Sequence, residues 1–147
     1  MRLKVIACNS LSREVYYTAA LSPHTVDVEL LDRSLHEEPA RLHEALQAAI
    51  DATDSARYDT IVLGLALCSN ATVDLVAPAI PVVLPRAHDC ITLMLGSRQR
   101  YNSSFRNNPG TYYYTIGWIE RAGMDKERIT TDVKLAREKN YREYVEK

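Results

Sequence analysis

The sequence has no marked excess of charge of either sign. Its 147 residues include 18 lysines and arginines against 19 aspartates and glutamates, which gives a formal net charge of -1. A chain so balanced lacks the global field that holds nucleic acid or an anionic membrane. Nucleic acid and membranes are therefore not expected as partners.

A long apolar run and a dinucleotide fingerprint are also missing. The apolar stretch at the start ends at Asn9, which makes it too short for a signal peptide or a membrane span. The pattern Gly-x-Gly-x-x-Gly does not occur where the first predicted strand meets its helix, which disfavours a Rossmann dinucleotide cofactor. We expect a soluble, cytoplasmic chain whose length suits one compact domain.

Cysteine is scarce, with Cys8, Cys68 and Cys90 as its three positions. Three cysteines cannot all pair within one chain, and a chain that is not exported stays in a compartment that keeps thiols reduced. We therefore interpret the three as thiols or metal ligands.

Three continuous apolar runs predict buried strands, at residues 3–7, 61–67 and 80–84. Runs without polar alternation are typical of parallel strands that are covered on both faces. Residues 25–31 alternate apolar and acidic side chains, which predicts a strand near the edge of the sheet. Residues 111–115 contain three tyrosines after a turn signal and are interpreted as a further strand or a strand-like platform.

Helical patterns separate the predicted strands. A short helical face follows the first strand, and a short helical piece is expected around residues 73–76. Asp89 is a good N-cap for a later helix with Ile91, Met94 and Leu95 facing inward. The clearest helix has Pro39 in its first turn and apolar side chains at helical spacing, namely Leu42, Ala45, Leu46, Ala49 and Ile50.

Strands that alternate with helices predict right-handed crossovers and helices on both faces of a parallel sheet. The expected fold is one α/β domain over residues 1–147, a three-layer sandwich with a mainly parallel, Rossmann-like or flavodoxin-like sheet. Residues 120–147 are expected to form a charged helical C-terminal extension, with a surface or partner-facing helix over residues 132–147. Ligands of such sheets bind beyond the carboxyl ends of the strands, where the strand order reverses.

The three cysteines all fall just after predicted strands, so the fold brings Cys8, Cys68 and Cys90 to this ligand-binding edge. Together with His88, two residues before Cys90, they form a Cys3His set of the kind that zinc accepts. Three thiolates alone can instead hold a 4Fe-4S cluster with one iron open to substrate. The residue types leave both cofactors open, and three buried structural cysteines are the alternative without a site.

Each cysteine precedes or opens a predicted helix, whose N-terminal N–H groups are expected to lower the pKa of the thiol. This leaves a metal-free alternative in which Cys90 is a nucleophile assisted by His88. The alternative for His88 is a histidine that packs against its loop and bonds a carbonyl.

Three polar residues near the cysteines are further candidates. Arg86 can bind a carboxylate or phosphate in a bidentate manner, or can be a solvated charge. Asp89 is a candidate acid or base, with helix capping as its simpler role, and Asn70 has the same ambiguity at the start of a short helix. Tyr112, Tyr113, Tyr114 and Trp118 can wall a pocket, although tyrosines on a strand usually pack in the core.

Four distinctive stretches lie at residues 5–8, 63–70, 85–97 and 109–118. They resemble the DUF1638 family, a domain family of unknown function, and the likeness spans nearly the whole chain. Its most specific part is the pattern Pro-Arg-x-His-Asp-Cys at residues 85–90. Relatives commonly continue beyond Lys147, so we expect that a C-terminal part is missing or naturally short.

The resemblance implies a bacterial or archaeal protein that accompanies corrinoid-dependent methyl transfer in one-carbon metabolism. The His-x-Cys pair with a further cysteine is also similar to the zinc set of thiol-activating methyltransferases, which have a different fold. The first hypothesis is thus a metal-binding protein that acts on or supports methyl- or sulfur-group transfer, either as a metal-dependent transferase or lyase or as an accessory protein. The alternatives are the metal-free cysteine enzyme and a non-catalytic partner of a corrinoid methyltransferase system. The expected partners are a small-molecule substrate and a corrinoid protein or methyltransferase, and the sequence allows a homo-oligomer.

Overall fold

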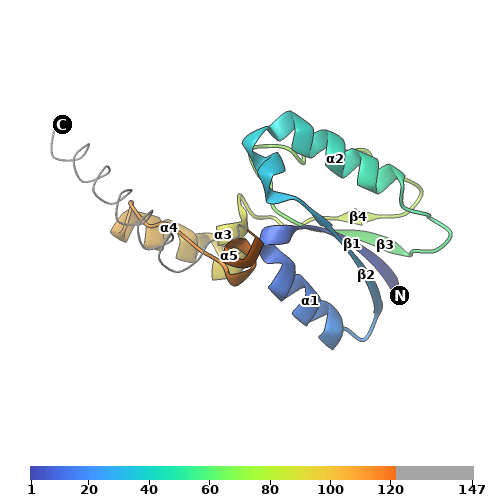
Figure 1. The fold of residues 1–147 in the computed structure, drawn as a ribbon, viewed down its shortest axis with the longest axis horizontal. Coiled ribbons are helices and arrows are strands. Elements are labelled where there is room, and N and C mark those ends of the chain that lie inside the picture. The colour runs from blue at the N-terminus through green and yellow to red at the C-terminus, as the bar shows by residue number, and fades with distance from the viewer. Residues whose placement is uncertain (122–147) are drawn as a thin grey trace.

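Four parallel strands form the centre of the computed structural model, which describes residues 1–121. Along the sheet they follow the order β2-β1-β3-β4 (Figure 1). Their bounds are Arg2–Cys8 for β1, Thr25–Leu31 for β2, Thr60–Gly64 for β3 and Val82–Val83 for β4. The predicted α/β class is therefore confirmed.

β1 occupies an interior position because its apolar residues pair on both sides. Val5 is paired with Val28 of β2 and with Val62 of β3. Ile6 and Ala7 are fully buried, as expected for a strand without polar alternation. β2, whose sequence does alternate, lies at an edge of the sheet as predicted.

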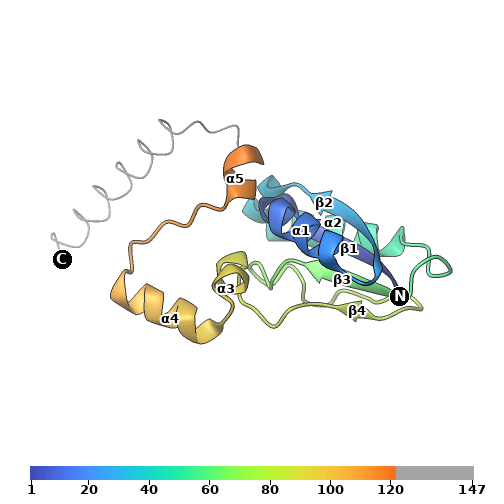
Figure 2. The same cartoon turned by 90° about the horizontal axis from the view of Figure 1, so that it is seen from below.

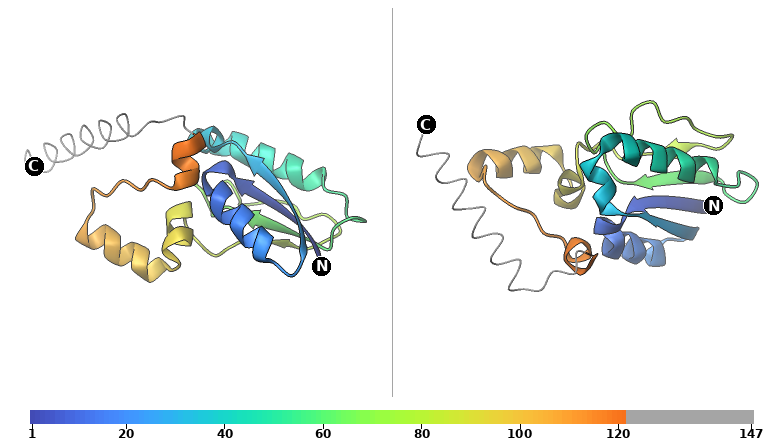
Figure 3. Two further views of the ribbon diagram at one scale, coloured as in Figure 1. Left: turned by 60° about the horizontal axis from the view of Figure 1, so that its bottom comes forward. Right: turned by 45° about the horizontal axis from the view of Figure 1, so that its top comes forward.

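Two helices cover the sheet from opposite sides, α1 (Ser12–Leu21) from one and α2 (Pro39–Asp51) from the other (Figures 1 and 3). α2 begins with proline in its first turn, where the missing N–H has no helical partner to lose. Its buried face packs into the main apolar cluster of the described residues. The side chains that α2 contributes are Leu42, Leu46, Ala49 and Ile50.

The chain changes direction across the sheet between β1 and β3. From β1 the chain passes through α1 to β2, which pairs with one side of β1. From β2 it crosses back through α2 to β3, which pairs with the other side of β1. These four strands have the order of the first four in a flavodoxin-like sheet, whose ligands bind where the strand order reverses. The reversal places the expected ligand edge between the carboxyl ends of β1 and β3.

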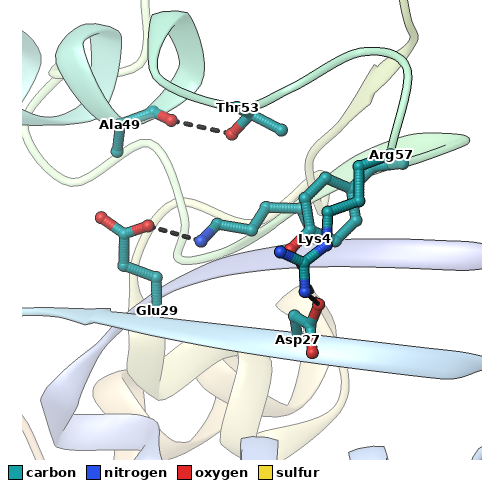
Figure 4. Close-up of polar contacts among 7 residues, drawn as sticks. Lys4, Asp27, Glu29, Ala49, Thr53 and Arg57 are labelled. Carbon is teal, nitrogen blue, oxygen red and sulfur yellow. Dashed lines mark hydrogen bonds and ion pairs between the residues drawn. The ribbon is translucent and has the colours of Figure 1, made fainter.

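Charged side chains tie the opposite, amino-terminal half of the sheet together (Figure 4). Lys4 of β1 lies 2.6 Å from Glu29 of β2. Asp27 accepts hydrogen bonds from Arg57 at 3.2 Å and from the Tyr58 hydroxyl at 2.7 Å. These contacts join β2 to β1 and to the loop before β3. They also give the acidic side chains on the edge strand β2 ion-pair and hydrogen-bond partners.

Three short helices lie beyond the carboxyl edge of the sheet, at the end away from the N-terminus (Figure 2). They are α3 (Cys90–Leu95), α4 (Arg98–Asn107) and α5 (Ile116–Arg121). α5 docks on the 3₁₀ turn Asn9–Leu11 that follows β1, because the Thr115 hydroxyl donates a 2.7 Å hydrogen bond to the Ser10 carbonyl. Gly117 permits this approach, since a Cβ there would lie 2.7 Å from the same carbonyl oxygen.

Several local predictions were wrong. Residues 73–76 are not helical, because the backbone enters the left-handed region at Asp74 (φ 61°). Residues 111–115 do not join the sheet and instead link α4 to α5. In α3 the buried residue is Thr92, whereas Met94 is exposed.

Two further predictions concern the ends of the elements. The third apolar run was predicted to be a strand over residues 80–84, but only Val82 and Val83 pair as β4. α4 was not predicted at all. The predicted helix at residues 132–147, and most of the extension from residue 120, lie outside the described residues.

Candidate functional site

All three cysteines lie at the carboxyl edge of the sheet. Cys8 is the last residue of β1, Cys68 follows the end of β3, and Cys90 is the first residue of α3, after β4. Because the strands are parallel, their carboxyl ends share one edge of the sheet. The topology therefore gathers the three thiols around the reversal between β1 and β3.

Cys8 has the most rigid surroundings. Its side chain is buried in the apolar cluster beneath α2, with Ile6 and Ala71 among its members. The sulfur lies 2.9 Å from the Ser10 hydroxyl oxygen. A single polar partner in an otherwise apolar setting fixes the direction in which this thiol points.

Cys68 opens a left-handed turn. Cys68, Ser69 and Asn70 have φ angles of 44°, 57° and 66° in succession. The left-handed region costs residues other than glycine about 1–2 kcal/mol each, with asparagine among the more tolerant. Asn70 is exposed in this turn. The left-handed backbone makes a strained loop where a helix after Cys68 was expected.

Backbone hydrogen bonds attach the Cys68 loop to the loop that carries Cys90. The Leu67 N–H donates to the Ala87 carbonyl at 3.1 Å, and the Cys68 N–H donates to the His88 carbonyl at 3.2 Å. These bonds extend the pairing of β3 with β4 past the carboxyl ends of the two strands. Cys68 is thereby held beside the residue that lies two positions before Cys90.

Asp89 caps α3, as the sequence predicted. Its carboxylate accepts hydrogen bonds from the Thr92 N–H at 2.7 Å and from the Thr92 hydroxyl at 2.8 Å. Burial disfavours the charged carboxylate, but these bonds and the neighbouring His88 outweigh burial and lower the pKa of Asp89. Asp89 is therefore ionised at neutral pH and places a negative charge next to Cys90.

The pKa values of two thiols are raised, contrary to the expected effect of helix N-termini. Burial is the largest cause for both Cys68 and Cys90, followed by the charges of the other cysteines and of Asp89. For Cys90 the pKa rises to about 11. Burial thus dominates the pKa of both thiols, and the charge of a neighbouring cysteine adds to it.

The proposed metal ligands are not assembled into one group in the part of the chain that the structure describes. Within residues 1–121, no three His, Cys, Asp or Glu side chains form a ready-made metal-binding group. His88 has a side chain that is 79% exposed, with Nδ1 at 3.4 Å from an Asp89 carboxylate oxygen. The predicted fourth ligand is therefore an exposed side chain that contacts Asp89.

A cavity of about 600 Å³ opens next to the Cys68 and Cys90 loops. Arg86 and His88, both predicted site residues, line one side of it. α4 supplies another side, which was not predicted because the helix itself was not predicted. The lining residues from α4 are Arg98, Tyr101 and Asn102.

The family comparison adds one finding to this geometry. The family model described as "Protein of unknown function (DUF1638)" matches residues 30–147, which is most of the chain. The chain belongs to the DUF1638 family. No curated protein and no solved structure matches it.

The match to DUF1638 includes almost every candidate residue. Cys68 and Cys90, with the cavity residues from both loops and from α4, lie inside the matched region. Cys8 lies before residue 30, so its place in the cluster depends on the structure and not on the family match.

Across residues 1–121, no helix combines the length and the apolar character needed to cross a bilayer.

α4 carried two sequence signals that could have revealed it. Ser97 precedes the helix and its hydroxyl accepts a hydrogen bond from the Arg100 N–H at 3.0 Å, which is a normal N-cap. Tyr101 and Phe105 are spaced one helical turn apart and stack at 6.3 Å between ring centroids. The rest of α4 is polar, which is why apolar periodicity did not show it.

Proposed function

We propose that this DUF1638 protein binds zinc or a 4Fe-4S cluster through Cys8, Cys68 and Cys90 and uses it on a small molecule. The observation that carries the proposal is that three thiols, far apart in the sequence, come from three strand ends to the point where the strand order reverses. Open α/β sheets bind their ligands at this point. Three structural cysteines of a core have no reason to share that edge.

The donor set suits both cofactors in kind. Three thiolates with His88 make a zinc set, and three thiolates alone hold a cluster with one open iron. The thiols still have to approach one another, because no ready-made group is formed in residues 1–121. Cys68 and Cys90 are only partly buried, Cys68 in a loop and Cys90 at the first position of α3, and rotation about their Cα–Cβ bonds would bring the sulfurs closer.

The protein's own residues have separate roles in this proposal. The apolar cluster and Ser10 hold Cys8 in place, while the backbone bonds to Ala87 and His88 hold the Cys68 loop. Asp89 fixes the start of α3 and pairs with His88. A bound metal would lower the pKa of a thiol or water attached to it and so provide a nucleophile at neutral pH.

The reaction class is proposed on the resemblance described above. A thiolate-held metal suits the transfer of a methyl or sulfur group, and the family's association with corrinoid systems points to a corrinoid protein as the partner. Such a protein would work in the cytoplasm, where its thiols stay reduced. The chain would then be a metal-dependent transferase or lyase, or an accessory to one.

Metal analysis of the full chain, purified without oxygen, tests the proposal. We expect about one zinc, or a brown protein with iron and sulfide, and loss of that metal in Cys8→Ser, Cys68→Ser and Cys90→Ser. His88→Gln tests the fourth ligand, and His24→Gln is its control because His24 is exposed just before β2, at the opposite edge of the sheet. A chain with neither metal and with three freely alkylated thiols would rule the proposal out.

A metal-free cysteine enzyme is the second candidate. The contact between His88 and Asp89 favours it. His88 is a base two residues before Cys90, and the Asp89 carboxylate orients it, as in enzymes with a base-assisted nucleophile. The raised pKa of Cys90 counts against it, since a thiol with a pKa of about 11 is almost entirely protonated at pH 7. Selective alkylation of Cys90 at neutral pH, in metal-free protein, would favour this candidate over the first.

A further inference from the structure

The cavity beside the cysteines holds two arginines that have no acidic partner in residues 1–121. Arg86 comes from the loop before Cys90, and Arg98 is the first residue of α4. Neither forms an ion pair or a side-chain hydrogen bond with another described residue, whereas other arginines of the chain do, such as Arg13 with Glu120 and Arg57 with Asp27. Two uncommitted guanidinium groups on one cavity are a suitable site for an anion.

The rest of the cavity wall is mainly apolar. Leu67 and Leu84 are exposed there and supply apolar surface that a ligand can cover. The volume of about 600 Å³ is within the range of small-molecule sites. Leu67 directly precedes Cys68 in the chain, so the cavity lies next to the Cys68 loop.

Charge also orients a ligand in the cavity. The Asp89 carboxylate is bonded to Thr92, which lines the cavity. Burial together with the Asp89 charge raises the pKa of Tyr101, another lining residue, so Asp89 acts on this part of the cavity. An anionic group is repelled from the Asp89 side and attracted to the arginines.

We infer that the cavity binds a small molecule that has a carboxylate or phosphate group and an apolar part. Arg86 and Arg98 would hold the anionic group, and Leu67 and Leu84 would contact the apolar part. The inference rests on the proposed function for the statement that this ligand is the substrate. The anion site itself follows from the cavity.

Three probes with the same hexyl chain test the inference, namely heptanoate, monohexyl phosphate and hexanol. Their binding to the full chain is measured by NMR shift perturbation, with and without metal. We expect the anionic probes to bind more tightly than hexanol, and Arg86→Gln and Arg98→Gln each to weaken them about tenfold. Arg106→Gln is the matched control, because Arg106 is on α4 but not on this cavity. The tighter anionic probe identifies the head group.

Equal binding of all three probes, or equal effects of the arginine variants and Arg106→Gln, would overturn the inference. Metal bound by the thiols without anion binding would overturn it while leaving the proposed function intact. Arginine-dependent anion binding to a chain that takes up no metal would support the anion site and contradict the proposed function. The two failures are therefore distinguishable.

Discussion

Replacing Gly64 with alanine is the sharpest test of how β1 and β3 meet beneath the cysteine edge. Gly64 ends β3 and is paired with Ala7, the residue before Cys8. A Cβ at Gly64 would lie 2.6 Å from the Ala7 Cβ, well inside van der Waals contact. Ala7 is fully buried and has no flexible side chain that can move aside, so the strands themselves must separate.

The expected loss of stability follows from two opposing effects. Overpacking a buried site costs about 1–3 kcal/mol, while the lower chain entropy of unfolded alanine returns about 0.4–1 kcal/mol. Gly64→Ala should therefore lower the free energy of unfolding by about 1–2 kcal/mol. For a chain of this size each kcal/mol corresponds to roughly 2–4 °C in melting temperature.

Urea unfolding of Gly64→Ala and Gly96→Ala measures the effect and separates it from backbone strain. Gly96 has nothing within 4 Å of an added Cβ, but its φ is 73°, so its substitution costs only the left-handed penalty of about 1–2 kcal/mol. The two variants differ in the site, because only Gly64→Ala separates β1 from β3 and should weaken metal uptake. Unchanged stability and metal content in Gly64→Ala would refute the close approach of the two strands.

Three other predictions concern single side chains. Thr115→Val should lower stability by about 1–3 kcal/mol in thermal unfolding, because it removes the buried hydrogen bond to Ser10, whereas Thr111→Val should have little effect because the Thr111 hydroxyl bond to Asn108 is exposed. Burial lowers the pKa of His36, so as the pH falls the unfolded chain binds a proton at this residue before the folded chain does. Stability should therefore fall as the pH decreases below about 6.5, and it should fall less in His36→Gln. Urea unfolding at pH 7 and pH 5 measures the difference. Alkylation of Cys90 in metal-free protein, followed by mass spectrometry, should accelerate about tenfold per pH unit from pH 7 to pH 10, and a plateau near pH 8 would contradict the raised pKa.

The sequence predicted the parts of the fold that repetitive apolar patterns encode. β1, the edge strand β2 and the helix that begins at Pro39 all lie where their patterns placed them. The position of the cysteines after strands could also be predicted, because a parallel sheet brings every strand end to one edge. The cap at Asp89 was predictable from the residue type alone.

Other features depend on contacts that no local pattern shows. Residues 111–115 have strand-forming side chains, but they follow α4 and pair with no strand within residues 1–121. Instead, the Thr115 hydroxyl bonds to the Ser10 carbonyl. The thiol pKa values depend on how deeply the loops bury the sulfurs, which the sequence does not state. The cavity was missed because one wall comes from α4, whose polar sequence gives no apolar stripe.

The strand order also affects the sequence of events during synthesis. Cys8 leaves the ribosome with β1, but its neighbour β3 is made only after β2 and α2, and the Cys90 loop comes later still. Until that point Cys8 is a solitary sulfur on an unfinished sheet, and the long-range pairing of β1 with β3 is a slow kind of folding step. A growing chain therefore cannot load its metal early, and the proposed cofactor would be inserted only after translation has passed α3.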